Sequence, residues 1–360
     1  TRAVFGRTMD FDLTDGKIPM LSTRKVPTRF MPIELVWFIS GDTNIKYLLD
    51  NNVNIWNSWV KPETAVYDND PKNFIKELEK QGVIKLDENF KEVYNHMDTA
   101  AVNAVAGMLS GKKVPDSRLL SGSIGDGAYG AQWRKWEDIR IISVEEVQAF
   151  IDKGYKELAR FNENVESKIE DRDHDTLEVK GYKAITDVVE RVIVQKKIDQ
   201  LKQVIDQINN NENSRRIIMS AWNVGRLDQM QLQPCHTLTQ WNVRRGEDGT
   251  KYLTCSLFCR SQDFLVGTCA NIAQYAMLTH MIAQVTGCVA ERLVWFGSNV
   301  HIYDNQIELA MDHLQRLPLR NPVRVALNKD ITDIDEFKPE DIKITGYENF
   351  LPPIKYPVAV

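Results

Sequence analysis

A cysteine between a proline and a histidine, Cys235, is the residue of this chain best suited to covalent chemistry. A cysteine thiolate is strongly nucleophilic and can form a transient covalent adduct with an electrophilic carbon. The pair Arg260-Ser261 suits a phosphate group, because arginine supplies charge and several donors. Asn271 can present both a donor and an acceptor to the edge of a base. Together with His301-Ile302-Tyr303, these are groups able to hold and attack a nucleotide base.

The composition limits the classes of protein to consider. The chain has 360 residues, 43% hydrophobic and 26% charged, and is long enough to bury a large core. Its formal net charge of -5 argues against nucleic acid as the main partner, because nucleic-acid-binding proteins are usually basic. No apolar run approaches the roughly 18 residues of a membrane-spanning helix, and no signal peptide is visible. We therefore expect a cytoplasmic protein without membrane association.

The cysteines give no sign of a metal site. There are five of them, an odd number, and no pair has the CxxC spacing typical of zinc sites. We expect neither a metal nor a disulfide framework, and we expect four of the five to be buried apolar fillers. Cys235 could be a filler as well, but its Pro-Cys-His context favours a nucleophile.

Two apolar segments are predicted to be buried helices, residues 32–39 and 271–285. The first contains Glu34, and a carboxylate in such a run is either paired or functional. Strands are predicted at 216–222, 238–244, 252–258 and 289–296, with a hairpin turn at 246–249. Several strands interrupted by long buried helices predict an α+β fold with a sheet covered on one face.

Two segments, at about 60–123 and 137–196, differ in character from the rest. In the first, short amphipathic helices are predicted at 71–81 and 88–97. In the second, charged helix is predicted at 144–168 and again at 185–197. Neither segment contains a group of residues suited to chemistry. We expect both to be peripheral insertions in a single catalytic domain spanning residues 1–360.

Several segments, in unbroken order, resemble the thymidylate synthase family and its pyrimidine hydroxymethylase branch. They are FGRTMDFDLTDG, PIELVWFISGDTNIKYLLDNNVNIWNSW, AYGAQWRKW, SRRIIMSAWNVGRLDQMQLQPCH, FCRSQDFLVG, ANIAQYAMLTHMIAQ, SNVHIYDNQ and GYENFLPPIKYPVAV. The resemblance implies that family's fold, with a mixed or antiparallel sheet packed by long helices and one sheet face forming a homodimer interface. It also implies a reaction at C5 of a pyrimidine nucleotide with 5,10-methylenetetrahydrofolate.

The resemblance implies a catalytic set around the thiol. Cys235 would add to C6 of the pyrimidine and turn C4–C5–O4 into an enolate, with nearby arginines lowering the thiol pKa. Glu34 matches a general acid/base carboxylate, although a buried glutamate can also merely satisfy a backbone group. Tyr129 matches the tyrosine whose hydroxyl helps water remove the C5 proton. His236 matches a polar neighbour of the nucleophile.

The resemblance also implies substrate contacts: Arg260 and Ser261 at the phosphate, Arg215 and Arg216 at the partner's phosphate across a homodimer interface, Gln240 beside the nucleophile, and His301 and Tyr303 at the 3′-hydroxyl. By themselves, two adjacent arginines are ordinarily a solvated surface pair, and a His-x-Tyr on a strand is more often structural. The family's N-terminal phosphate-binding arginine would lie before Thr1 or close to it. The chain lacks an initiator methionine, so we expect its natural N-terminus to lie upstream.

Asn271 matches the amide that reads the base. It can accept from uracil N3–H and donate to O4, whereas an aspartate would suit cytosine, so it favours dUMP. Its alternative role is a helix N-cap. The resemblance implies the following folate contacts: Trp56, Trp59 and Leu232 as an apolar wall, Asp263 at the pterin ring, and Val360, whose carboxylate closes over the ligands.

Departures from the synthase pattern cluster around the pyrimidine: Cys259 replaces a glutamine, Ala270 a phenylalanine, Asn299 an aspartate and Gln306 a histidine. The hydroxymethylase branch also loses that phenylalanine and that aspartate. Space at Ala270 admits a water, which would add to the exocyclic methylene in place of hydride.

The sequence favours a dUMP hydroxymethylase, which would fit a virus that replaces thymine in its DNA. A thymidylate synthase, favoured by an intact Trp56, stays open, as does a non-catalytic nucleotide- or RNA-binding regulator.

Overall fold

The computed structural model describes residues 1–68, 79, 118–172, 179–318, 322–347, 351 and 353–357. Except for residue 79, the helices predicted at 71–81 and 88–97 lie outside the described residues, as does the terminal Val360. The chain forms two compact units, one of residues 1–133 with 201–360, the other of residues 134–200. Each unit is described by itself below.

A five-stranded mixed sheet, in the order β1-β10-β9-β8-β7, forms the centre of the first unit. Its strands are β1 (Arg2–Asp12), β7 (Ile218–Ser220), β8 (His236–Arg245), β9 (Lys251–Asp263) and β10 (Val289–Ile302). β9 and β10 run parallel, and the other neighbouring pairs run antiparallel. The prediction of an α+β fold is confirmed. The strand predicted at 216–222 is shorter than expected, because only three residues pair with β8.

The sheet has one covered and one open face. Along β9, Leu253, Cys255, Leu257 and Cys259 are buried, while the residues between them are half-buried. Successive side chains of a strand point to opposite faces, so this alternation places the core on one side of the sheet. On the open side, the half-buried rings of Phe258 and Phe296 stack, with centroids 4.7 Å apart.

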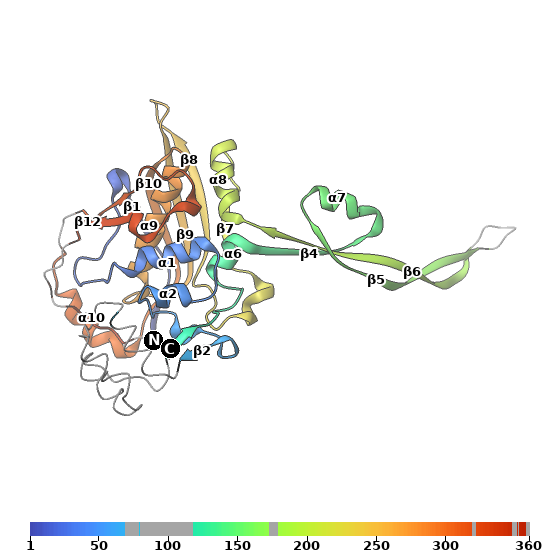
Figure 1. Ribbon diagram of the computed structural model, residues 1–360, viewed down its shortest axis with the longest axis horizontal. Helices are drawn as coiled ribbons and strands as arrows, with labels where there is room; N and C mark the ends of the chain where they lie inside the picture. The colour runs from blue at the N-terminus through green and yellow to red at the C-terminus, as the bar shows by residue number, and fades with distance from the viewer. Residues whose placement is uncertain are drawn as a thin grey trace, which may run out of the picture. The chain divides into compact units, whose positions relative to one another are not determined.

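Two buried helices cover the core face (Figure 1). They are α1 (Phe30–Ser40) and α9 (Gly267–Val285), and both are apolar on nearly all sides, as expected of helices surrounded by protein. α9 packs on β9 and β10, and α1 packs on α9. α1 ends at Gly41, whose φ of 68° is the left-handed conformation that glycine adopts readily at a helix C-terminus. Both predicted helices are therefore confirmed.

Smaller elements complete the first unit. They are α2 (Lys46–Asp50), α6 (Tyr129–Lys135), α8 (Gln200–Asn210), α10 (Ile307–Leu314), the pair β2 (Val66–Asp68) and β3 (Arg118–Ser121), and the pair β11 (Arg324–Leu327) and β12 (Ile342–Thr345). Within the described ranges, no helix is both long and apolar enough to cross a membrane.

The second unit is a three-stranded antiparallel sheet, so the prediction of charged helix was wrong at 185–197 and holds within 144–168 only at residues 144–152. Its strands are β4 (Trp136–Ser143), β5 (Lys156–Arg172) and β6 (Val179–Ile198), and its one α-helix among the described residues is α7 (Val147–Asp152). Val192 and Val194 of β6 are fully buried beside Ile142. Val192 and Val194 are two residues apart, as are side chains on one face of a strand, and both are β-branched. These features favour a strand and outweigh the helical propensity of the surrounding charged residues.

Candidate functional site

Cys235 lies at the residue before β8, where its backbone is held from both sides. Its N–H donates to the hydroxyl of Tyr129 at 2.7 Å, and its carbonyl accepts from the N–H of Arg260 at 2.8 Å. The thiol itself is half-buried. A thiol with a fixed backbone and partial access to solvent is suited to attack a bound molecule.

Arg260, on β9, holds the loop that leads to the thiol. Its Nε donates to the carbonyl of Pro234 at 2.8 Å, and its Nη2 donates to the carbonyl of Gln233 at 2.7 Å. The guanidinium also lies over the ring of Trp222, 5.3 Å from its centroid. This places a fixed positive charge beside Cys235.

The thiol nevertheless has a raised pKa. Burial raises the pKa of Cys235 above its ordinary value, and the charge of Arg260 and the hydrogen bond with Tyr129 lower it by a smaller amount. The prediction that nearby arginines lower the pKa is right for Arg260 but wrong for the net result, because desolvation outweighs the arginine. The resting group is therefore a thiol, and its proton must leave when sulfur attacks.

Tyr129, at the start of α6, is 3% exposed and lies between the thiol and the core. Burial and the neighbouring Cys235 hold the pKa of its phenol well above the usual range, so the hydroxyl stays protonated. Its oxygen accepts from the Cys235 backbone, which leaves its own proton free to be donated. The ring stacks on His236 with centroids 4.0 Å apart and planes 13° apart.

His236, which follows Cys235 in the sequence, is buried and uncharged. Burial lowers the pKa of His236 to about 3, so the imidazole is uncharged near neutral pH. Its Nδ1 lies 2.8 Å from the hydroxyl of Tyr275, which comes from α9. Tyr275 thus fixes His236, and His236 supports the ring of Tyr129 by stacking.

Glu34 lies in α1 and is 6% exposed. Its Oε1 accepts from Nε1 of Trp56 at 2.5 Å, and its Oε2 accepts from Nε2 of Gln274 at 2.6 Å. Burial raises the pKa of Glu34, while these two donors lower it. The alternative that Glu34 only satisfies a backbone group does not describe these contacts, because both oxygens bond to side chains.

Asn271 lies inside α9, four residues after its first residue, Gly267. Val266 occupies the N-cap position, so the N-cap alternative for Asn271 was wrong. Its neighbour Ala270 is buried, as is Cys259 on the core face of β9. The structure therefore places small side chains at two of the three predicted specificity positions.

The end of β10 forms a corner with several predicted residues. Nδ1 of His301 lies 3.1 Å from Oδ1 of Asn299, and the rings of His301 and Tyr303 meet nearly at right angles, with centroids 5.3 Å apart. Gln306 is fully buried, and its Oε1 accepts from the backbone N–H of Tyr303 at 3.0 Å. This corner holds Tyr303 at its backbone and the His301 ring through Asn299.

Gln306 also connects the corner to the chain terminus. Its Nε2 donates to the carbonyl of Pro357 at 2.9 Å and to Oδ2 of Asp263 at 3.4 Å. Oδ1 of Asp263 accepts from the backbone of the turn before α9. Tyr356, next to Pro357, is held by His313 at 2.8 Å. One amide therefore joins the described end of the tail to the carboxylate predicted to contact the pterin.

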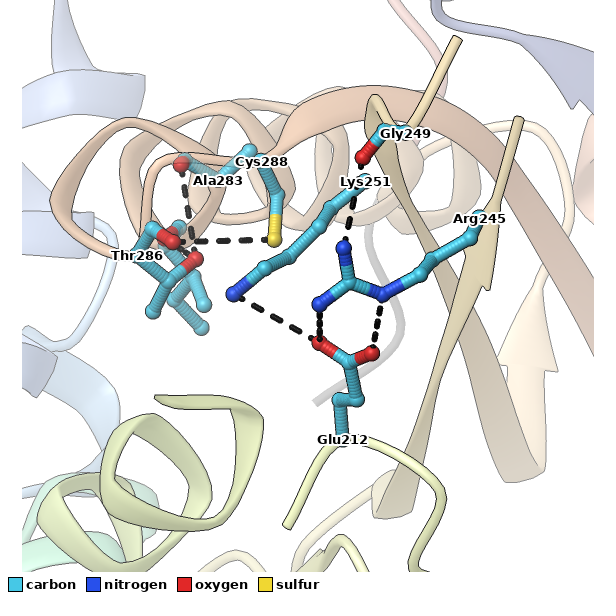
Figure 2. A network of polar contacts seen from close by, with 8 residues as sticks. Glu212, Arg245, Gly249, Lys251, Ala283, Thr286 and Cys288 are labelled. Atoms are coloured by element: carbon cyan, nitrogen blue, oxygen red, sulfur yellow. Dashed lines mark hydrogen bonds and ion pairs between the residues drawn. The ribbon is translucent and has the colours of Figure 1, made fainter. Parts of the chain in front are cut away.

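The two predicted interface arginines follow an anchored turn. Glu212 accepts from Nε of Arg245 at 2.5 Å and lies 3.5 Å from Nζ of Lys251, so the segment after α8 is tied to the β8–β9 hairpin (Figure 2). Arg215 and Arg216 come next and are exposed. The carbonyl of Arg215 accepts from the side chain of Gln240 on β8, at 3.3 Å. The remaining predicted residues, Ser261, Trp59 and Leu232, are half-buried.

A cavity of about 770 Å³ in the first unit is lined by none of the predicted site residues. Its walls are mostly apolar and include Phe11, Leu265, Cys269 and Ile272. A second cavity, of about 440 Å³, is lined by His301 together with residues of β1 and β10. The thiol of Cys235 lines neither cavity.

Sequence reasoning missed two residues of this site, Gln274 and Tyr275. Both lie in the apolar helix α9, where they are buried. Gln274 follows Asn271 by three residues, the spacing that places two side chains on one face of a helix. A glutamine in an apolar run at that spacing was a signal that could have indicated a polar contact with Glu34.

A half-buried thiol whose backbone is fixed by a buried tyrosine and an arginine is suited to covalent catalysis. The sequence model of the family described as "Thymidylate synthase" matches residues 1–360, so the chain belongs to the thymidylate synthase family. The protein is thus a one-carbon transferase, and its family uses methylenetetrahydrofolate as cosubstrate. A dUMP substrate fits this family.

Proposed function

We propose that the protein transfers a one-carbon unit to C5 of dUMP and lets water add to it, giving 5-hydroxymethyl-dUMP. The observation that carries the transfer is the thiol of Cys235, held at its backbone by Tyr129 and Arg260. The observation that favours water over hydride is the small, buried side chain of Ala270 next to the base-reading Asn271.

In the proposed reaction, the half-buried thiol of Cys235 gives its proton to solvent water as sulfur bonds to C6 of the uracil, while electrons move toward O4 and make C5 nucleophilic. C5 then attacks the one-carbon unit that the bound folate supplies. The hydroxyl of Tyr129, whose proton is not engaged by the Cys235 backbone, helps a water take the C5 proton. Departure of the folate amine leaves an exocyclic methylene on the pyrimidine. Water then adds to this methylene. Release of Cys235 from C6 completes the turnover.

The choice between water and hydride depends on what surrounds that methylene. A water needs space and polar partners. In this proposal Ala270 leaves room that the phenylalanine of the synthase pattern would fill, and Glu34 supplies a carboxylate that can take a proton from the water as it adds. In this proposal Cys259 and Asn299 complete the altered surroundings, Cys259 by its small buried thiol and Asn299 through its contact with His301.

The folate contacts belong to the same proposal. Asp263 has an oxygen with only a long contact of 3.4 Å to Gln306, so it can accept from a pterin N–H. Trp59 and Leu232 are apolar side chains packed against the core with surface left to cover. An acceptor together with apolar surface suits a planar heterocycle that carries donors.

A thymidylate synthase is the second candidate, and Trp56 favours it. Its ring is packed against Phe38 and Tyr129 and its Nε1 is bonded to Glu34, so the tryptophan wall is rigid. A rigid wall shields the methylene from bulk water and so favours reduction by hydride. This enzyme would give dTMP and dihydrofolate.

Incubation with dUMP and methylenetetrahydrofolate separates the two candidates. We expect a product one oxygen atom heavier than dTMP, with no rise in the dihydrofolate absorbance, because the folate is not oxidised when water adds. The measurement is a mass spectrum of the nucleotide together with the absorbance trace. If dihydrofolate forms in step with dTMP, the protein is a thymidylate synthase and the hydroxymethylase proposal is wrong.

Base selection is tested with Asn271→Asp. An aspartate can accept from the exocyclic amine of cytosine but loses the donor to uracil O4, so we expect the preference to shift toward dCMP. The ratio of kcat/KM for dCMP and dUMP should change by roughly tenfold or more, the scale of one or two hydrogen bonds in a buried site. The variant Asn210→Asp, at the exposed end of α8, is the matched control. An unchanged ratio would remove Asn271 from the role of base reader.

We also propose a symmetric homodimer formed through the open face of the sheet. This face carries the half-buried stacked pair Phe258 and Phe296, whose apolar surface a second copy would cover. Arg215 and Arg216 would reach the partner's phosphate, consistent with their exposure and with the anchored turn that precedes them.

A further inference from the structure

Gln274 is a buried amide that joins α9 to α1 at the proposed catalytic carboxylate. Its side chain is 5% exposed. Its Nε2 donates to Oε2 of Glu34 at 2.6 Å and to the carbonyl of Met31 at 3.2 Å. An amide nitrogen has two hydrogens, so both are used by α1. The position of Gln274 is therefore fixed by the backbone of α1 as well as by the carboxylate.

The second oxygen of Glu34 faces another donor. Nε1 of Trp56, in the turn that leads into the short helix Asn57–Trp59, donates to Oε1 at 2.5 Å. The indole N–H and the amide NH₂ donate and do not accept. An ionised carboxylate accepts from both, whereas the proton of a carboxylic acid would find no acceptor in either. Two donors from different elements also fix the plane of the carboxylate.

We propose that Gln274 is a positioning residue that keeps Glu34 ionised and correctly oriented to take a proton from the water that adds to the substrate. This inference rests on the proposed function, in which Glu34 handles that proton. Gln274 acts through Glu34 and need not contact the substrate.

Burial outweighs the two donors, so the pKa of Glu34 is raised overall, and the loss of either donor would raise it further. Burial raises its pKa, and the hydrogen bond from Gln274 is the larger of the two effects that lower it, ahead of that from Trp56. Among the described residues, the ionisable group that faces Glu34 from α9 is the phenol of Tyr275, whose own pKa is held well above the usual range by burial. Tyr275 is therefore neutral, and the two donors are what counteract burial.

Two variants test the proposal through the pH dependence of kcat. Gln274→Met keeps an unbranched side chain of similar length without the donor, and Gln274→Glu places a second carboxylate against the first. In both, Glu34 holds its proton up to a higher pH. We expect kcat near neutral pH to fall roughly ten- to hundredfold, the scale of a hydrogen bond to a charged group, and to recover in alkaline buffer. The acid limb of the profile should move to higher pH.

The readouts separate this role from mere packing. Thr279→Val is the matched control, because Thr279 is a buried polar residue of the same helix whose hydroxyl bonds to the carbonyl of Tyr275. It should leave the limb in place. If both Gln274 variants keep the wild-type limb, or lose activity equally at every pH, the proposal is overturned. The C=O stretch of a protonated carboxyl in infrared difference spectra reads out Glu34 directly in any folded variant. If wild-type protein does not turn over dUMP, the proposed function itself fails.

Discussion

Cys235→Ser is expected to lower kcat by at least about 10⁴-fold, the scale lost when a covalent nucleophile is removed. A serine hydroxyl is far less nucleophilic than a thiolate and has no base beside it here, since the imidazole of His236 is bonded to Tyr275 and has a pKa of about 3. The short hydrogen bonds at Cys235 are made by its backbone, and the thiol donates only at 3.9 Å to the carbonyl of Gln233, a contact that a serine hydroxyl can replace, so the substitution should leave the loop intact.

The loss should therefore appear in kcat, with dUMP binding within a fewfold of wild type. Single-turnover kinetics and equilibrium binding measure the two quantities separately. Cys288→Ser serves as the control, because this half-buried cysteine contacts the carbonyl of Thr286 and lies in none of the proposed contacts. Full activity in the Cys235 variant would refute the covalent mechanism.

Glu34→Gln is expected to have the next largest effect, a loss in kcat of about 10²- to 10⁴-fold, typical of removing a general acid or base. The amide cannot take a proton, and the acid limb of the pH profile should disappear. The new side chain also carries an NH₂ group in place of one carboxylate oxygen. This NH₂ group faces the donor of either Trp56 or Gln274, so we also expect the variant to be less stable. Thermal unfolding of the variant measures that second effect.

The exchange Glu34→Gln with Gln274→Glu separates catalysis from stability. The double variant restores a donor opposite an acceptor, because the new amide on α1 donates to the new carboxylate on α9 and its oxygen accepts from Trp56. The carbonyl of Met31, which accepts from Gln274 at 3.2 Å, loses its donor in this variant, so we expect the melting temperature to recover only in part relative to Glu34→Gln while kcat stays low. Wild-type turnover in the double variant would mean that the carboxylate is needed only for packing.

The sequence predicted the elements that carry the site better than it predicted the contacts. The apolar run around Glu34 correctly indicated a buried helix, and the alternation before Arg260 indicated a strand. The partner of Glu34 on α9 was missed, because a contact between two helices depends on their packing and is not encoded in either local pattern. For Trp56 we predicted only an apolar wall, and the structure adds a hydrogen bond from its indole to the carboxylate.

The second unit shows the limit of local pattern more clearly. Charged residues spaced along 144–168 and 185–197 indicated helix, yet β5 and β6 pair with each other along most of their length. The pairing register between two distant segments decides this outcome, and Val192 and Val194 reveal it only once their common buried face is known. That residues 60–123 and 137–196 are insertions in one catalytic domain stays a prediction.

The thiol pKa was mispredicted for a related reason. Proximity to arginine can be inferred from a motif, but the degree of burial around Cys235 depends on Tyr129 and other residues distant in sequence. Desolvation prevails over the charge of Arg260 in this chain.

The most direct test is to trap the adduct with 5-fluoro-dUMP and methylenetetrahydrofolate. Fluorine at C5 cannot leave as a proton does, so the reaction should stop with sulfur bonded to C6. A mass spectrum of the digested protein should show nucleotide and folate together on the peptide that contains Cys235, in near-stoichiometric amount. If dUMP binds but no adduct forms, the protein is a nucleotide-binding regulator. An adduct on any other cysteine would also contradict the account.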